Sequence, residues 1–194
     1  IVYNISKMES KNVALVLSSG GARGLAHIGA IEALLANGFV IKSIAGTSMG
    51  ALVGGVYASG NLSDFRDFFI NLGKMDVIRL MDLAINKQGI IKGERVFKEM
   101  ERFVAGINIE ELSIPFTAIA TDLTNHREVI FNHGRLIDAI RASAAVPNVL
   151  HPFMLGQSLL VDGGIVNPLP LNRVHISPGD LLVAVNVNAP RGSV

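Results

Sequence analysis

Short runs of apolar residues that favour β-structure alternate along this chain with longer stretches whose apolar positions recur at helical spacing. Residues 13–17 form the first run, and residues 25–35 carry a helical pattern that ends at residues 37–38. Residues 40–45 predict a second strand, which leads through a glycine-containing turn into an uncharged helix reaching about residue 58. Two successive strand–loop–helix units predict an α/β fold with a parallel sheet covered by helices.

The remaining apolar patterns predict further helices and strands. Helices are expected at residues 62–72, 94–104 and 136–145, and strands at residues 116–121, 128–131, 159–161 and 181–187. We expect Pro147 to end the last helix and the segment containing Gly89 and Gly93 to connect the first two. No linker interrupts the pattern, which predicts one domain over residues 1–194. Because an apolar run lies close to the end of the sequence, we expect the natural chain to continue.

Composition narrows the class of protein. Hydrophobic residues make up 49% of the 194 residues and charged residues 17%, against about 25% charged in typical soluble domains. The net charge of +1 argues against a nucleic-acid partner. The absence of cysteine excludes disulfides and thiolate metal ligands.

Residues 43–63 and 142–161 carry almost no charge and imitate membrane spans. The first stretch contains five glycines and the second contains Pro147 and Pro152, so buried elements explain them better. The first ten residues lack the apolar region of a signal peptide. We therefore expect a cytoplasmic or membrane-peripheral protein, with a surface that meets lipid.

The strongest chemical signal is a serine between small residues, at the junction of the second strand and its helix. Gly46 and Gly50 lie two positions either side of Ser48, the spacing of a nucleophile elbow. Such a turn lifts the hydroxyl out of the sheet and places it at a helix N-terminus, which favours developing negative charge. The alternative is a glycine-rich turn in which Ser48 caps the helix.

A second glycine-rich loop, residues 19–24, follows the first strand. A dinucleotide-binding loop would require an acidic residue about 20 positions later, and residues 42–45 contain none. A phosphate-binding P-loop would require Gly-Lys-Ser/Thr, which is also absent. The remaining interpretations are a simple tight turn or an oxyanion hole, whose backbone N–H groups await the negative oxygen of a tetrahedral intermediate.

Asp162 comes directly after the apolar residues 159–161 and before Gly163 and Gly164. An aspartate at a strand end, followed by glycines, can reach a neighbouring site. Asp-Gly is equally the commonest hairpin signal, so by itself this feature also fits an ordinary turn.

Together these loops resemble the bacterial patatin-like phospholipases, and the resemblance covers residues 13–187. It is carried by Ser18-Ser19-Gly20-Gly21-Ala22-Arg23-Gly24, Gly46-Thr47-Ser48-Met49-Gly50, Ala120-Thr121-Asp122-Leu123, Arg141-Ala142-Ser143-Ala144-Ala145-Val146-Pro147, Asp162-Gly163-Gly164 and Asn167-Pro168-Leu169-Pro170. The chain departs from the family pattern at Ser19 and Asn148, where glycine is usual.

The resemblance implies a three-layer α/β/α fold with a mostly parallel central sheet. It implies that Ser48 is the nucleophile, that Asp162 is its partner in a catalytic dyad, and that Gly20 and Gly21 donate oxyanion hydrogen bonds in a loop supported by Arg23. The expected substrate is a lipid or another acyl ester, and no cofactor or metal is expected. The other motif residues shape the three loops: Ser19, Ala22, Gly24, Gly46, Gly50, Gly163 and Gly164.

Most serine hydrolases use histidine, so the five histidines compete with this dyad. His175 follows Asp162 in the order of an α/β-hydrolase triad, and His151 lies between apolar residues near the expected site. His27 is expected in a packing or surface role, and His126 and His133 in polar loops.

Two charged residues have open roles. Arg141 could contact a phosphate headgroup or belong to a structural ion pair, and Asp122 is expected to cap a strand end. No carboxylates have calcium-loop spacing.

The prediction is therefore calcium-independent hydrolysis of fatty-acyl esters. The alternatives are an acyltransferase and a non-catalytic lipid- or acyl-binding module.

Overall fold

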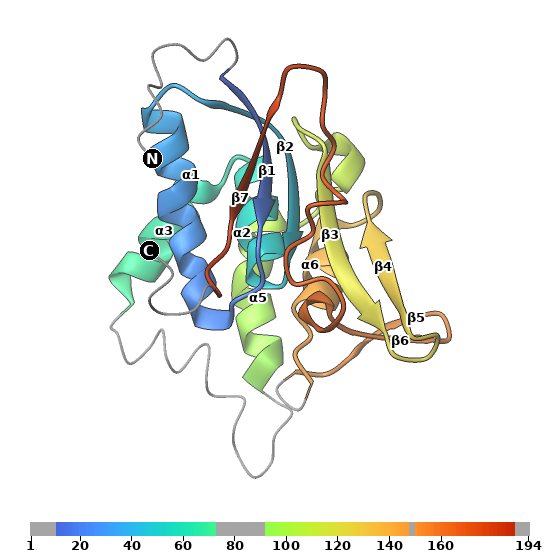
Figure 1. The fold of residues 1–194 in the computed structure, drawn as a ribbon. Coiled ribbons are helices and arrows are strands. Elements are labelled where there is room, and N and C mark those ends of the chain that lie inside the picture. Colours follow the sequence, from blue (N-terminus) through green and yellow to red (C-terminus); the bar gives the residue numbers. More distant parts are fainter. Residues whose placement is uncertain (1–10, 73–91, 148–149, 189–194) are drawn as a thin grey trace.

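The computed structural model describes residues 11–72, 92–147 and 150–188. In these ranges a seven-stranded sheet forms the centre of the molecule (Figure 1). Its parallel part has the order β7-β1-β2-β3. These strands are β1 (Asn12–Leu17), β2 (Val40–Thr47), β3 (Phe116–Asp122) and β7 (Leu181–Val185).

Three antiparallel strands extend the sheet beyond β3. They are β4 (Arg127–Phe131), β5 (Phe153–Leu155) and β6 (Ser158–Asp162). Both β4 and β6 pair with β3, and β5 pairs with β6. The α/β class predicted from the alternating patterns is confirmed.

The described helices share one hydrophobic core on one face of the sheet. They are α1 (Ala26–Ala36), α2 (Met49–Ala58), α3 (Leu62–Asn71), α5 (Lys92–Val104) and α6 (Leu136–Ser143). Completely buried side chains from the strands and helices meet there, including Leu17, Ile31, Ile44 and Ile140. On the opposite face of β2, the hydroxyl groups of Ser43 and Thr47 donate to the carbonyls of His175 and Asn167. The segment before β7 therefore crosses that face.

The register of β3 brings the ends of two other strands together. β2 pairs with β3 as far as Thr47, opposite Ile119. β6 then pairs with the next part of β3 and ends with Asp162 opposite Ala120. β2 runs parallel to β3, and β6 runs antiparallel to it. The C-terminal ends of β2 and β6 therefore approach each other.

Some boundaries differ from those predicted. Gly93 lies inside α5 rather than in a connector, whereas Gly89 is outside the described residues. α6 ends at Ser143, before Pro147, because the Ala145 carbonyl accepts a hydrogen bond from the Asp162 amide and the chain leaves the helix. The short strand β5 was not predicted. Among the described helices, none is long and apolar enough to cross a membrane.

Candidate active site

Ser48 occupies a sharp turn between β2 and α2. Its backbone has φ 56° and ψ −120°, a conformation that costs roughly 1–3 kcal/mol for a residue with a side chain. Its amide donates to Ser143 Oγ at 2.8 Å, which helps to hold this geometry. A Cβ on Gly50 would lie 2.3 Å from the Leu17 carbonyl oxygen, so only glycine lets α2 start this close to β1. A Cβ on Gly46 would likewise meet the Gly50 backbone at 2.4 Å.

The Ser48 hydroxyl donates to Asp162 Oδ2 at 2.5 Å. The other carboxylate oxygen, Oδ1, accepts from the Gly164 amide at 2.7 Å. The Asp162 carbonyl accepts from Thr121 Oγ1 at 2.9 Å. A Cβ on Gly163 would lie 2.2 Å from the Ile119 carbonyl oxygen, so the turn after Asp162 requires glycine there. Backbone and side-chain bonds thus fix the carboxylate against the serine.

Both members of this pair are buried, with 5% of Ser48 and 7% of Asp162 exposed. Burial raises the pKa of Asp162, because removing a carboxylate from water disfavours its charged form. The hydrogen bonds from Ser48 and Gly164 oppose that rise without cancelling it. A carboxylate with a raised pKa is a stronger base than an aspartate in water.

The glycine loop after β1 lies against the start of α2. It contains a 3₁₀ helix, Gly21–Leu25, preceded by Gly20. The first N–H groups of a helix have no acceptor within it, so the amides at this end are available to a ligand. A Cβ on Gly24 would lie 2.3 Å from Met49 Cγ, which shows how closely the loop packs beside Ser48's helix. Ala22 is exposed at the loop surface.

The segment after β7 is hydrogen-bonded to this loop. Asn188 Nδ2 donates to the Ser19 carbonyl at 2.5 Å, and Arg23 Nη2 donates to Asn188 Oδ1 at 2.8 Å. The Ser19 amide donates to the Pro168 carbonyl at 2.8 Å. Ser19 also lies beside Gly164, where an added Cβ would be 3.2 Å from its Oγ. Arg23 therefore contacts the loop's support rather than the serine–aspartate pair.

None of the five histidines forms a hydrogen bond with Ser48 or Asp162 in the described ranges. His175 has its carbonyl bonded to Ser43, which precedes Ser48 by roughly 16 Å of extended strand, so the triad order predicted as an alternative does not assemble. His126, His133 and His151 are exposed.

His27 is fully buried below the glycine loop. Its Nε2 bonds the Ser18 carbonyl at 2.9 Å, which requires the proton on Nε2. Nδ1 has no partner. Burial lowers the pKa of His27, so the neutral ring holds the end of β1 in place.

Several contributors to the site were not assigned from the sequence. Ser143 lies within the motif at residues 141–147, which was a usable signal, but its partner was not evident. Asn188 carried no signal, because its role depends on where the chain goes after β7.

Asp122 accepts hydrogen bonds from the Thr124 and Asn125 amides at 3.0 and 3.1 Å. These bonds make Asp122 a cap for the turn after β3. Hydrogen bonds, first that from the Asn125 side chain, lower the pKa of Asp122 to about 2. Within the described ranges, no three His, Cys, Asp or Glu side chains gather as a metal site would require.

Comparison with known proteins identifies the family. Residues 15–175 match the family described as patatin-like phospholipase. An uncharacterized NTE family protein of Mycobacterium tuberculosis is 46% identical over 179 residues, which cover 92% of this chain and 50% of that protein. Lysophospholipase NTE1 of Debaryomyces hansenii is 30% identical over 190 residues, covering 94% of this chain and 12% of that protein.

The fold also resembles the crystal structure of VipD from Legionella pneumophila, with a TM-score of 0.60 and 15% sequence identity over 91% of this chain and 49% of VipD. The chain belongs to the patatin-like phospholipase family, whose members are lipid hydrolases. It spans about half the length of the mycobacterial relative.

Proposed function

We propose that this chain hydrolyses fatty-acyl ester bonds of lipids, with Ser48 as nucleophile and Asp162 as general base. The observation that carries the proposal is the 2.5 Å hydrogen bond from Ser48 Oγ to Asp162 Oδ2, made by a serine in a strained strand-to-helix turn. A nucleophile in contact with a base that is itself held by a third group is the arrangement expected of covalent catalysis. Here the Gly164 amide is the group that holds the base.

In the first half-reaction, Ser48 Oγ attacks the carbonyl carbon of the ester and Asp162 takes the hydroxyl proton. The carbonyl π-electrons move to the oxygen, giving a tetrahedral oxyanion. When this intermediate collapses, the bond to the alkoxide breaks and Asp162 passes its proton to the departing oxygen. The products are the alcohol and an acyl group on Ser48.

Water completes the cycle by the same route. Asp162 removes a proton from water as the water oxygen attacks the acyl-enzyme, and the second tetrahedral intermediate expels Ser48. The proton returns to the serine oxygen and the fatty acid leaves. The raised pKa of Asp162 supports both proton transfers, because a base works best when its pKa approaches the working pH.

The amides of Gly20 and Gly21 are proposed to stabilise the oxyanion. Support comes from their position at the start of a 3₁₀ helix that packs against Met49, next to the nucleophile. One such donor contributes about 2.7–4 kcal/mol to the transition state in a serine protease. Arg23 and Asn188 would act indirectly, by keeping this loop in place.

Exposed apolar side chains on the β5–β6 hairpin and just after Asp162 support a lipid substrate and peripheral contact with a membrane. Met154 and Leu155 lie at the end of β5, and Ile165 follows Asp162 in the chain; their exposed fractions are 58%, 49% and 55%. Exposed apolar side chains of this kind can serve as contacts with lipid or another partner.

A chain-length series tests the substrate class. We expect kcat/KM to rise from p-nitrophenyl acetate through butyrate to octanoate, because each buried CH₂ contributes about 0.8 kcal/mol. The rates should be the same in EDTA and in added calcium, because backbone amides polarise the carbonyl in this mechanism. A flat or falling series would remove the lipid substrate, and loss of activity in EDTA would remove the metal-free mechanism.

The same preparation separates hydrolysis from the alternatives. A fluorophosphonate probe should label the protein, and p-nitrophenol should be released from the p-nitrophenyl esters over multiple turnovers. Labelling without continuous release would favour an acyltransferase, while absence of both would favour a binding module.

A further inference from the structure

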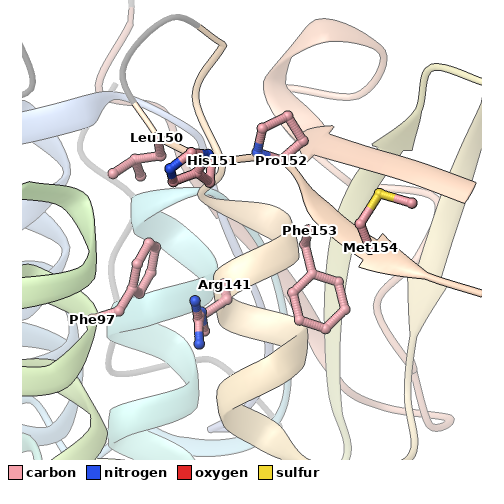
Figure 2. A pocket seen from close by; sticks show the side chains of 7 residues that line it. All are labelled: Phe97, Arg141, Leu150, His151, Pro152, Phe153 and Met154. Carbon is pink, nitrogen blue, oxygen red and sulfur yellow. The ribbon is translucent and has the colours of Figure 1, made fainter. Parts of the chain in front are cut away.

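A small pocket of about 180 Å³ lies beside α6, between α5 and the segment that leads into β5 (Figure 2). This volume is below the roughly 300–1,000 Å³ of pockets that hold a whole small ligand. The guanidinium of Arg141 lies 5.6 Å from the centre of the Phe97 ring there, as a cation–π contact. A separate group of hydrogen bonds connects the opposite face of the sheet to the proposed active site.

Residues 163–173, which we call the crossing segment, bind two loops of the proposed site. The Asn167 carbonyl accepts a hydrogen bond from Thr47 Oγ1 at 2.8 Å, and Thr47 directly precedes the nucleophile. The next carbonyl, that of Pro168, accepts from the Ser19 amide at 2.8 Å, and Ser19 directly precedes the proposed oxyanion donors. Two consecutive carbonyls therefore fix the nucleophile turn and the glycine loop relative to each other.

The crossing segment also starts at the proposed base. The Asn167 amide donates to the Gly163 carbonyl at 2.9 Å, which closes a turn directly after Asp162. The main chain of Asn167 thus connects the turns that carry both members of the proposed dyad. A shift of this residue would change the distance between them and the alignment of the glycine loop.

Glu128 on β4 holds the side chain of Asn167. It lies opposite Thr121 in the pairing of β4 with β3, on the face of the sheet that the crossing segment covers. Its Oε1 accepts from Asn167 Nδ2 at 2.6 Å, and its Oε2 accepts from Arg173 Nε at 2.7 Å. The Glu128 side chain is 16% exposed, and hydrogen bonds to a sheltered carboxylate are stronger than those to a neutral acceptor. Glu128 therefore fixes the crossing segment at two points, one of which is Asn167.

We propose that Glu128 is a positioning residue for the hydrolysis and acts through Asn167. The inference rests on the proposed function and adds to it a residue that touches neither the ester nor the reacting atoms. The hydrogen bond from Asn167 to Glu128 keeps the two carbonyls of the crossing segment where Thr47 and Ser19 meet them. Catalytic alignment is sensitive to displacements of about 1 Å, whereas binding of an acyl chain depends on buried apolar area. Loss of the Glu128 carboxylate is therefore expected to lower kcat and to leave KM nearly unchanged.

The test measures kcat and KM for p-nitrophenyl octanoate, together with Tm, in variants at these two positions. Glu128→Ala and Asn167→Ala should each lower kcat by about 10-fold, with KM changed less than about 2-fold. Glu128→Gln should recover most of kcat, because its amide oxygen still accepts from Asn167 Nδ2 although the ion pair with Arg173 is lost. The double variant Glu128→Ala/Asn167→Ala should be no slower than the slower single variant, because both changes remove the same hydrogen bond.

Glu32→Ala is the matched control, because it breaks another ion pair between two elements, that of Glu32 on α1 with Arg66 on α3 at 2.7 Å. Its kcat should stay within about 2-fold of the wild-type value. If Glu32→Ala lowers kcat as much as Glu128→Ala does, the effect is a general loss of stability and the positioning role is refuted.

Other outcomes of the same experiment also overturn the proposal. A lower Tm with unchanged kcat in Glu128→Ala would show that Glu128 supports the fold alone. A Glu128→Gln variant as slow as Glu128→Ala would assign the effect to the ion pair with Arg173, and multiplied losses in the double variant would show that Glu128 does not act through Asn167. If Glu128→Ala does not fold, Asn167→Ala decides, since an unchanged kcat there refutes the role. If the wild-type protein hydrolyses no ester, the proposed function itself fails, and the positioning role fails with it.

Discussion

Ser143 provides the sharpest test of how the fold holds the nucleophile. Its hydroxyl is fully buried and accepts the Ser48 amide at 2.8 Å. Ser143→Ala removes this acceptor and leaves a buried N–H without a partner, which costs about 1–3 kcal/mol. In a domain of this size each kcal/mol lowers Tm by about 2–4 °C, so the expected fall is roughly 2–12 °C.

The activity should fall as well, because Ser48 is held in a backbone conformation that it would not adopt freely. A displacement of about 1 Å at a reacting group can reduce the rate by about 100-fold. We therefore expect kcat for p-nitrophenyl octanoate to fall by about 10-fold to 100-fold in Ser143→Ala. Thermal unfolding and steady-state kinetics on the same preparation measure both effects.

Ser59→Ala is the matched control for this variant. Ser59 caps the other end of α2, where its hydroxyl donates to the Val56 carbonyl at 2.8 Å. We expect its loss to leave kcat unchanged. A lower Tm with unchanged kcat in Ser143→Ala would show that Ser143 supports the fold without positioning Ser48, and no change in either quantity would refute the reasoning.

The remaining predictions concern the base and the glycine loop. Asp162→Asn should lower kcat by about 10³-fold or more, because the amide cannot accept the serine proton, and should raise Tm at pH 7, because it removes a buried charge. The acid limb of kcat/KM should lie above 3.8, the ordinary pKa of this group, because burial raises the pKa in the folded protein. Asn188→Ala should lower kcat by about 10-fold, because the glycine loop loses two hydrogen bonds.

Each of these outcomes has a result that contradicts it. If the Tm of Asp162→Asn at pH 7 is unchanged or lower, the claim that the buried carboxylate of Asp162 destabilises the folded protein is contradicted. The sign follows from the raised folded pKa: the wild-type protein loses stability relative to Asp162→Asn as pH rises from 3.8 through the folded pKa, and keeps that difference above it. An acid limb at or below 3.8 contradicts the same claim. For Asn188, the exposed Asn37→Ala is the control, and equal activity of the two variants would remove the bracing role.

The sequence predicted most of the elements because apolar runs and helical periodicity reflect burial directly. The strand β5 escaped prediction since it has only three residues and is largely exposed, so no alternation could mark it. Gly93 was expected in a connector, although it lies within α5. Local propensity opposes glycine in helices, and the helix forms here against that propensity.

The candidate site was predictable where the chemistry lies in a local motif. The turn at Ser48 and the glycine loop are each encoded within a few residues. The contact between Ser48 and Asp162 depends instead on β6 joining β3 just beyond the end of β2, a register that no local pattern specifies. The hydrogen bonds of Ser143 and Asn188 likewise follow from the path of distant segments. The catalytic roles of these residues stay predictions.

The most direct test of the central claim is the position of a covalent adduct formed by an active-site-directed probe. The wild-type protein is treated with a fluorophosphonate, digested and mapped by mass spectrometry. We predict a single adduct on the peptide containing Ser48, slower formation of that adduct in Asp162→Asn, and none in Ser48→Ala. An adduct on any other residue, or labelling of Ser48→Ala at the wild-type rate, would contradict it.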